Sequence, residues 1–221
     1  MEIRNYIDHT VLKAVSTEDD IKKLCDEARE YGFYAVCVNG CYVKLAKEQL
    51  SDTYVKIASV IGFPLGAMKK DAKVFEAKEA IADGADEIDM VMNIGLFKSG
   101  KHIEVEQEIR EIKEAIGENV LKVIIETCYL TQDEIVKACE LSVNAGADFV
   151  KTSTGFGTDG ATYENLKLMI DTVDGRAQVK AAGGVRDIDT AKKFIDLGVN
   201  RLGTSSGVSL IKSGKSKEGE Y

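Results

Sequence analysis

The feature that most constrains the fold of this chain is a repeated unit, in which a polar, amphipathic stretch ends at a glycine before a short apolar run. Four copies are evident, and their glycines are Gly32, Gly84, Gly146 and Gly198. A glycine just past a helix end supplies the left-handed cap, and each apolar run after it is too short and too β-branched to form another helix. Each copy therefore predicts a helix, its C-terminal cap and a buried strand.

Eight segments have the length and apolar content of buried strands. They are residues 6–9, 35–38, 56–61, 87–92, 121–126, 149–152, 179–181 and 201–203. Helical segments separate most of them: Thr131 and Glu134 form a capping box, and Asp187 can cap the segment after it. Eight apolar strands alternating with helices in 221 residues suit a closed barrel better than an open doubly wound sheet. We therefore predict a single-domain α/β chain, a (β/α)8 TIM barrel over residues 1–212 with a flexible tail at 213–221.

Composition narrows the class of partner and the compartment. With 29 basic and 37 acidic side chains the net charge is −8, and no basic stripe stands out, so a nucleic-acid partner is disfavoured. The five cysteines are an odd number without a C-x-x-C pair, which favours a reducing cytosol over a disulfide framework. No apolar run has the length of a signal peptide or a membrane span. We expect a cytoplasmic protein with no membrane partner.

Polar side chains near the carboxyl ends of the predicted strands mark the candidate active site, because in such barrels these ends face the site. The candidates are Asp8, Cys37, Asp89, Glu126, Lys151 and Lys180. This set is too polar for a core that serves only packing.

Two lysines, Lys151 and Lys180, lie inside consecutive short apolar strands, where an unpaired ammonium costs several kcal/mol of desolvation. If both face the barrel mouth, each cation disfavours protonation of the other and burial acts in the same direction. One amine can then be neutral near pH 7 and form a Schiff base with a carbonyl. The alternative is that both point outward or pair with carboxylates as structural ion pairs.

A carboxylate is the third candidate. Strand alternation places Asp89 on the same face as Glu87, so parity alone does not decide which of them reaches the mouth. Because Asp89 is nearer the carboxyl end of its strand, we favour it as the group that orients a water or assists proton transfer. A carboxylate that only pairs with a lysine is the alternative.

Two glycine-rich turns follow the seventh and eighth predicted strands, where barrels of this type commonly hold a phosphate. The first contains Gly183 and Gly184, and the second contains Gly203, Ser205 and Ser206. Tight turns are the alternative explanation. Neither turn has the dinucleotide or Walker pattern, so no nucleotide site is implied. The histidines and cysteines show no zinc-ligand spacing, so we expect no metal.

Five ordered motifs together resemble the deoxyribose-phosphate aldolase family. They are IDHTVLK (7–13), EIDMVMN (87–93), KVIIET (122–127), FVKTSTGF (149–156) and VKAAGGVR (179–186). The resemblance implies a (β/α)8 class I aldolase without metal or cofactor. Such an enzyme reversibly cleaves 2-deoxy-D-ribose 5-phosphate to acetaldehyde and D-glyceraldehyde 3-phosphate.

Residue roles follow from the same resemblance. Lys151 would form the Schiff base, Lys180 would lower its pKa, and Asp89 would transfer protons with Lys180 through water. The implied substrate-binding residues are Asp8, Cys37, Thr154, Gly183, Gly184, Gly203, Ser205 and Ser206. As a further hypothesis, the C-terminal Tyr221 enters the site and assists a proton transfer. The resemblance also makes a homodimer or higher homo-oligomer an expectation.

Two other interpretations stay open from the sequence. The chain could be another Schiff-base aldolase for a different sugar phosphate, which an aldol assay with acetaldehyde as donor would separate. It could also be a non-catalytic sugar-phosphate-binding barrel whose lysines are only salt-bridged. Borohydride trapping with acetaldehyde distinguishes this binder, because only an enzyme with a reactive amine gains mass.

Overall fold

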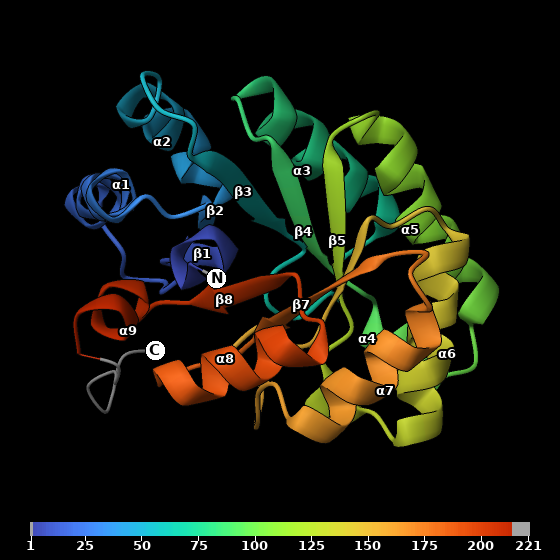
Figure 1. Ribbon diagram of the computed structural model, residues 1–221. Coiled ribbons are helices and arrows are strands. Elements are labelled where there is room, and N and C mark those ends of the chain that lie inside the picture. The colour runs from blue at the N-terminus through green and yellow to red at the C-terminus, as the bar shows by residue number, and fades with distance from the viewer. Residues whose placement is uncertain (1, 214–221) are drawn as a thin grey trace.

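A computed structural model describes residues 2–213 and shows a closed barrel of parallel strands in the order β1 to β8 (Figure 1). The strands are β1 (Ile7–Thr10), β2 (Ala35–Asn39), β3 (Lys56–Ile61), β4 (Glu87–Val91), β5 (Val120–Ile124), β6 (Phe149–Lys151), β7 (Gln178–Ala182) and β8 (Arg201–Thr204). This confirms the predicted (β/α)8 TIM barrel.

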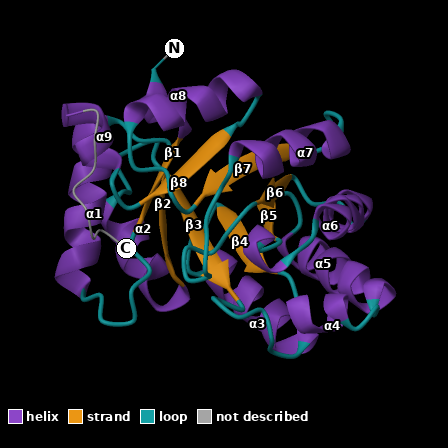
Figure 2. Ribbon diagram, turned by 90° about the horizontal axis from the view of Figure 1, so that it is seen from below, coloured by secondary structure: helices purple, strands orange, loops and turns teal. Residues whose placement is uncertain are grey.

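Helices surround the strands on the outside of the barrel (Figure 2). The α-helices are α1 (Glu18–Tyr31), α2 (Val43–Gln49), α3 (Lys70–Ala82), α4 (Ile94–Lys98), α5 (His102–Ile116), α6 (Gln132–Asn144), α7 (Tyr163–Val173), α8 (Ile188–Leu197) and α9 (Gly207–Ser213). Short 3₁₀ turns are η1 (Ile3–Tyr6), η2 (Gly40–Tyr42) and η3 (Thr127–Tyr129). Among residues 2–213, no helix combines the length and apolar composition needed to cross a membrane.

The predicted helix ends are confirmed by local geometry. Gly32 (φ 66°) and Gly198 (φ 117°) cap α1 and α8 in the left-handed region, which glycine enters without a Cβ clash. At the other end of α6, the Thr131 hydroxyl accepts from the backbone N–H of Glu134, and the Glu134 carboxylate accepts from the backbone N–H of Thr131. The Asp187 carboxylate likewise caps α8.

All eight predicted strands exist. The third has the predicted bounds, and the other seven differ by one or two residues at one or both ends. The largest error is at the fifth strand, which we expected to run to residue 126 but which ends at Ile124. Glu126 adopts φ 54°, a left-handed conformation that cannot continue an extended strand. At the first strand, Tyr6 belongs to η1 and not to β1.

Strand alternation divides each strand between two environments. In β4, Ile88 and Met90 belong to the large apolar core, while the side chains of Glu87 and Asp89 are buried in contact with charged groups. Since register partners in a parallel sheet share a face, the partner pair Asp89 and Lys122 places the Lys122 side chain on the same inner face as Asp89. The barrel interior is therefore charged along this side.

The same register continues around the barrel. Lys151 on β6 is the register partner of Lys180 on β7, and Lys180 is in turn the partner of Arg201 on β8. These three basic side chains therefore project into one interior from adjacent strands. The tail predicted at 213–221 lies outside the described residues, except for Ser213 at the end of α9, and so does Tyr221.

Candidate active site

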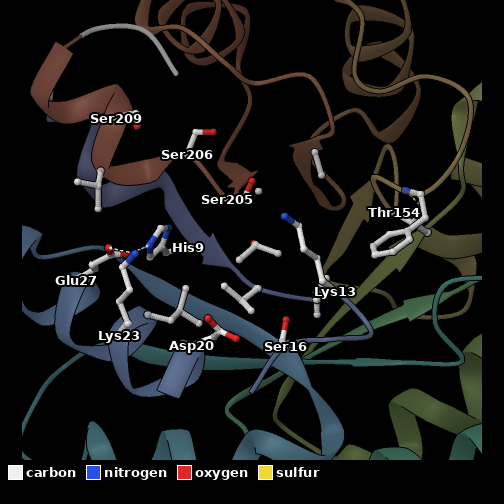
Figure 3. A pocket seen from close by; sticks show the side chains of 18 of the residues that line it. His9, Lys13, Ser16, Asp20, Lys23, Glu27, Thr154, Ser205, Ser206 and Ser209 are labelled. Atoms are coloured by element: carbon white, nitrogen blue, oxygen red, sulfur yellow. Dashed lines mark hydrogen bonds and ion pairs between the residues drawn. The ribbon is translucent and has the colours of Figure 1, made fainter. Parts of the chain in front are cut away.

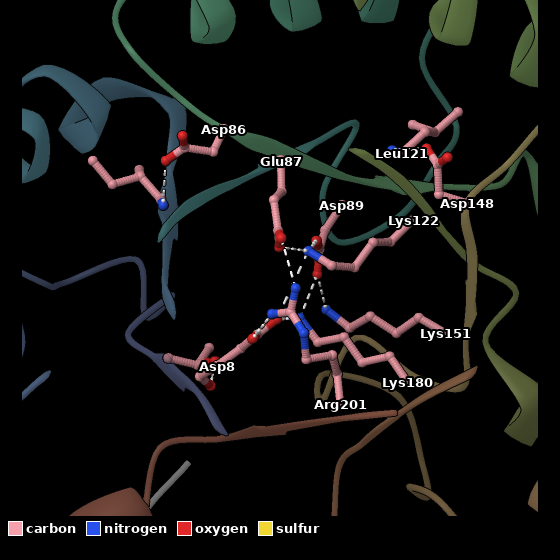
Figure 4. Close-up of polar contacts among 12 residues, drawn as sticks. Asp8, Asp86, Glu87, Asp89, Leu121, Lys122, Asp148, Lys151, Lys180 and Arg201 are labelled. Carbon is pink, nitrogen blue, oxygen red and sulfur yellow. Dashed lines mark hydrogen bonds and ion pairs between the residues drawn. The ribbon is translucent and has the colours of Figure 1, made fainter. Parts of the chain in front are cut away.

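The reactive lysine proposed from the sequence lies at the carboxyl end of its strand, at the barrel mouth. Lys151 is the last residue of β6 and is 3% exposed. Its Nζ lies 2.7 Å from Oδ2 of Asp89, which projects from β4 across the barrel (Figure 4). A short apolar strand thus delivers a buried amine to the carboxyl end of the barrel.

The second lysine meets the same carboxylate. Lys180 Nζ lies 2.8 Å from Oδ2 of Asp89, the oxygen that also accepts from Lys151, so the two nitrogens are separated by no more than the sum of these two distances. Lys180 also donates to Oδ2 of Asp8 on β1. The structure therefore places four of the sequence candidates, Asp8, Asp89, Lys151 and Lys180, in one contact network.

The pKa values of the two amines shift in opposite directions. Burial lowers the pKa of Lys151, the Asp89 carboxylate opposes this, and the Lys180 cation lowers the pKa further, leaving it below the ordinary lysine value. Burial acts on Lys180 in the same direction, but the carboxylates of Asp8 and Asp89 outweigh it and hold that pKa above the ordinary value. Lys151 is therefore the better nucleophile of the pair, since only an unprotonated amine adds to a carbonyl.

The carboxylates of the network stay ionised. Burial alone would raise the pKa of Asp8, but Lys180, Lys122 and Arg201 lower it to about 2. Burial also acts against ionisation of Asp89, and its lysine neighbours still keep its pKa well below the usual range. Asp89 is therefore available as a proton acceptor beside Lys151 at neutral pH.

A cavity of about 480 Å³ opens at the carboxyl ends of β1, β6, β7 and β8 (Figure 3). Lys151 lies in its wall together with Thr154, Gly203, Ser205 and Ser206, all of which were candidates from the sequence. This volume suits a small phosphorylated metabolite.

The glycine pair after β7 lies outside the cavity lining. Ala182 lines the cavity, whereas Gly183 and Gly184 are absent from the lining and form the following turn with φ of 77° and 80°. A Cβ added to Gly160 would meet the Gly183 backbone at 2.4 Å, so two chain segments touch here. The geometry of Gly183 thus serves this close approach as well as the turn.

Thr154 is fixed by a buried carboxylate. Its backbone N–H donates to Oε1 of Glu126 at 3.1 Å, and its hydroxyl donates to Oε2 of the same side chain. Burial raises the pKa of Glu126, although both bonds from Thr154 oppose the shift. Glu126, a candidate from the sequence, therefore lies behind the cavity wall and positions Thr154.

Cys37 lies inside the barrel among apolar side chains. It is fully buried and belongs to a small cluster with Leu12, Ala58 and Val60. Burial raises the pKa of its thiol, and the Asp89 charge adds to the increase. Cys37 is therefore a neutral packing group at neutral pH, near the network but outside the cavity lining.

Sequence reasoning did not assign four charged residues that the structure brings to the site. Lys122, Glu87 and Arg201 join the interior network. Lys13, from the loop between β1 and α1, lines the cavity, and Figure 3 shows its side chain pointing inward on the side of Ser205. Lys122 carried the same signal as the two assigned lysines, a cation in an apolar strand. Among residues 2–213, no cluster of three or more His, Cys, Asp or Glu could hold a metal ion.

Comparisons with known proteins agree with this geometry. A family described as DeoC/LacD family aldolase matches residues 3–210. The deoxyribose-phosphate aldolase of Thermococcus gammatolerans is 57% identical over 222 residues, covering 99% of each chain. That of an Exiguobacterium species is 56% identical and covers 98% of each. A solved deoxyribose phosphate aldolase from Aeropyrum pernix, described as tetrameric, superposes with a TM-score of 0.87 at 32% identity, over 96% of this chain and 91% of that one. Fold, site and relatives together show that the chain belongs to the DeoC/LacD family of aldolases.

Proposed function

We propose that the chain is a class I deoxyribose-phosphate aldolase that cleaves 2-deoxy-D-ribose 5-phosphate reversibly to acetaldehyde and D-glyceraldehyde 3-phosphate. One observation carries the proposal. Lys151, a buried lysine with a lowered pKa, lines a cavity of metabolite size and touches an ionised carboxylate. The identity of the substrate is inferred from the relatives named above, which are deoxyribose-phosphate aldolases.

The chemistry assigns Lys151 a covalent role. Its neutral Nζ adds to the aldehyde carbon of the open-chain sugar, and loss of water leaves a protonated imine. When a base removes the proton of the C3 hydroxyl, the C2–C3 bond breaks and its electrons enter the imine. Glyceraldehyde 3-phosphate leaves from the resulting enamine. Protonation of the enamine carbon and hydrolysis then release acetaldehyde and restore the amine.

Asp89 and Lys180 are suited to moving the protons. The Asp89 carboxylate accepts hydrogen bonds from both lysines at one oxygen, so a proton that leaves Lys151 has an acceptor 2.7 Å away. Lys180, held charged by two carboxylates, is a proton donor within the same network. Water that enters with the substrate would connect these groups to the reacting carbons.

The phosphate end of the substrate is proposed to bind at the part of the cavity wall formed by the end of β8 and the loop after β1. The carboxyl end of β8 offers Gly203, and the turn after β8 offers Ser205 and Ser206. Lys13 adds a cation from the loop after β1, and a lysine ammonium is a common partner of phosphate. The turn of Gly183 and Gly184 would contribute backbone N–H groups beside them.

For phosphate recognition we expect Lys13→Met to raise KM for 2-deoxyribose 5-phosphate by roughly 10- to 100-fold, the range for one charged hydrogen bond. Steady-state kinetics with 2-deoxyribose and with its 5-phosphate measure the effect. The kcat/KM for unphosphorylated sugar should change little, and Ser205→Ala should act in the same direction. Lys137→Met, on an exposed ion pair of α6, is the control. Equal losses on both sugars would contradict the assignment.

Reductive trapping tests the function as a whole. Borohydride added to the full-length protein with acetaldehyde should replace one N–H hydrogen by an ethyl group, a net gain of C₂H₄, and peptide mapping should place this group on Lys151. Lys73 is an internal control, because burial lowers its pKa as well but it lies beside Glu108, away from the cavity. A binding protein without catalysis would gain no mass, and labelling of Lys73 alone would overturn the assignment.

Three expectations from the sequence extend the proposal. A cytoplasmic location is supported by the free cysteines, of which Cys25, Cys37 and Cys139 are buried thiols. A homo-oligomer is supported by the tetrameric relative, and light scattering would test it. The role of Tyr221 in proton transfer stays a prediction, and unchanged turnover after its deletion would dispose of it.

A further inference from the structure

Six charged side chains inside the barrel form a closed ring of ion pairs in which the sign of the charge alternates (Figure 4). In order around this ring, hereafter the charge ring, they are Asp8, Lys180, Asp89, Lys122, Glu87 and Arg201. None of their side chains is more than 5% exposed.

The first half of the charge ring contains the proposed catalytic groups. Lys180 bridges Oδ2 of Asp8 and Oδ2 of Asp89, the latter at 2.8 Å. The other oxygen of Asp89, Oδ1, accepts from Lys122 Nζ at 2.7 Å. Asp89 thus uses its two oxygens for two different ring cations.

The second half of the charge ring consists of Lys122, Glu87 and Arg201, which have no role in the proposed mechanism. Lys122 donates to Oε2 of Glu87, and Oε1 of Glu87 accepts from Nη2 of Arg201 at 2.6 Å. The other guanidinium nitrogen, Nη1, donates to Oδ1 of Asp8. Every carboxylate therefore contacts at least two ring cations, and every cation contacts at least two carboxylates. Lys122 also lies 3.7 Å from Oδ2 of Asp8, across the ring.

The charge ring reaches the end of the barrel opposite the cavity. Glu87 and Arg201 are the first residues of β4 and β8, and they line an opening at the amino ends of the strands. The guanidinium of Arg201 lies over the ring of Tyr34, 3.4 Å from its centroid. Since neither Glu87, Lys122 nor Arg201 lines the cavity of Lys151, a substitution there leaves the substrate contacts in place.

Lys151 is a seventh ionisable group, and it contacts a ring whose positive and negative charges are equal in number. Three carboxylates and three cations cancel, and Lys151 joins the ring only through Asp89. The other titratable groups near it are Cys37 and Glu126, whose pKa values burial raises, so neither readily supplies a compensating anion. Protonating Lys151 would leave one uncompensated charge in a site shielded from water, which is unfavourable.

Resting on the proposed function, we propose that the charge balance of this ring keeps Lys151 unprotonated, and that Glu87, Lys122 and Arg201 are positioning residues that set the pH range of imine formation. They act through Asp89 and through the electrostatic field of the interior, without touching the substrate.

The pKa shifts of the ring cations are opposite to that of Lys151, which supports this proposal. Burial lowers the pKa of Lys122 and of Arg201, but carboxylate neighbours, Asp89 for the first and Asp8 for the second, outweigh it and raise both above their ordinary values. Lys151 is the barrel lysine for which burial prevails. The cations of the ring are thus held charged, whereas the pKa of the attached Lys151 lies below the ordinary lysine value.

Removing a negative charge from the ring and removing a positive charge from it should shift the protonation of Lys151 in opposite directions. Glu87→Gln removes a negative charge at constant shape, leaves the interior with an excess of positive charge and disfavours protonation of Lys151. Lys122→Met removes a positive charge and makes Lys151 the missing counter-ion, which favours its protonation. The double variant restores the balance. A loss of packing cannot produce shifts of opposite sign that cancel.

The experiment follows the initial rate of borohydride trapping of acetaldehyde on Lys151 in full-length protein across pH, by intact mass and peptide mapping. The pH of half-maximal labelling should fall by about one to two units in Glu87→Gln and rise by a similar amount in Lys122→Met. It should return toward the wild-type value in the double variant. Glu106→Gln, which removes a charge from an exposed pair with Arg110, is the control and should leave the midpoint unchanged.

Circular dichroism identifies variants that fold, and Arg201→Met replaces Lys122→Met if the latter does not, with the same expected rise. Midpoints that stay fixed, or that move in one direction for both signs of substitution, overturn the role of the charge ring. If the wild-type protein is not labelled at Lys151 at any pH, the proposed function itself fails. The two failures are therefore distinguishable.

Discussion

We expect the Lys151→Ala variant to lose turnover by roughly 10⁵-fold or more, because removing a covalent nucleophile causes losses of that order. The remaining carboxylate and ammonium groups cannot form an imine with the substrate carbonyl, because none of them is a neutral amine, so imine formation should disappear with turnover. Cleavage of 2-deoxyribose 5-phosphate in a coupled assay and trapping with acetaldehyde measure the two losses on the same preparation.

The fold should survive this substitution, which makes the loss interpretable. The Lys151 side chain makes one ion pair, with Asp89, and Asp89 keeps its ion pairs with Lys122 and Lys180. The charge ring is therefore complete without it, and circular dichroism should match that of the wild-type protein. Lys167→Ala, which removes an exposed lysine of α7, is the matched control. Substantial activity in Lys151→Ala would contradict the covalent role.

The barrel was predictable because its strands carry two local signals. Glycines such as Gly32 and Gly198 end helices in the left-handed region, and apolar runs of strand length follow. The signals fail where one residue's conformation decides the boundary. The apolar pattern runs to Ile125, but the φ of 54° at Glu126 cannot continue an extended strand, and hydrogen bonds from Thr154 hold the Glu126 side chain in place.

The reactive end of the site was predictable for a similar reason. A lysine inside an apolar strand conflicts with its surroundings, and Lys151 and Lys180 both show this conflict. Alternation also placed Glu87 and Asp89 on one face. It did not decide between them, and the structure shows why: both are interior, Asp89 at the level of Lys151 and Glu87 nearer the amino end.

The positions of Arg201 and Lys13 in the site could not be predicted from local sequence patterns. Arg201 opens its strand, a position that in sequence resembles a solvent-exposed strand end, and only barrel closure brings it to Asp8 on β1. Lys13 lies in a loop without periodicity, so nothing local directs its side chain to the cavity. Both depend on contacts between the two ends of the chain, which local patterns do not encode.

The second large effect is expected for Lys180→Leu. Removing this cation leaves the charge ring with three carboxylates and two cations, so Lys151 becomes the counter-ion of Asp89 and its pKa rises. The neutral fraction of an amine falls about tenfold for each unit by which its pKa exceeds the pH. At neutral pH we therefore expect imine formation to slow by 10- to 100-fold or more, and turnover to fall at least as far.

The pH dependence separates the two roles given to Lys180. Trapping on Lys151 should recover as the pH is raised, because the amine is again deprotonated, and the midpoint should lie above that of the wild-type protein. If Lys180 only set that pKa, turnover would recover in parallel. If it also donates protons, kcat stays low at every pH while trapping recovers, and this is the result we expect. An unchanged trapping midpoint would show that Lys180 does not control Lys151, and would also remove the basis of the charge ring.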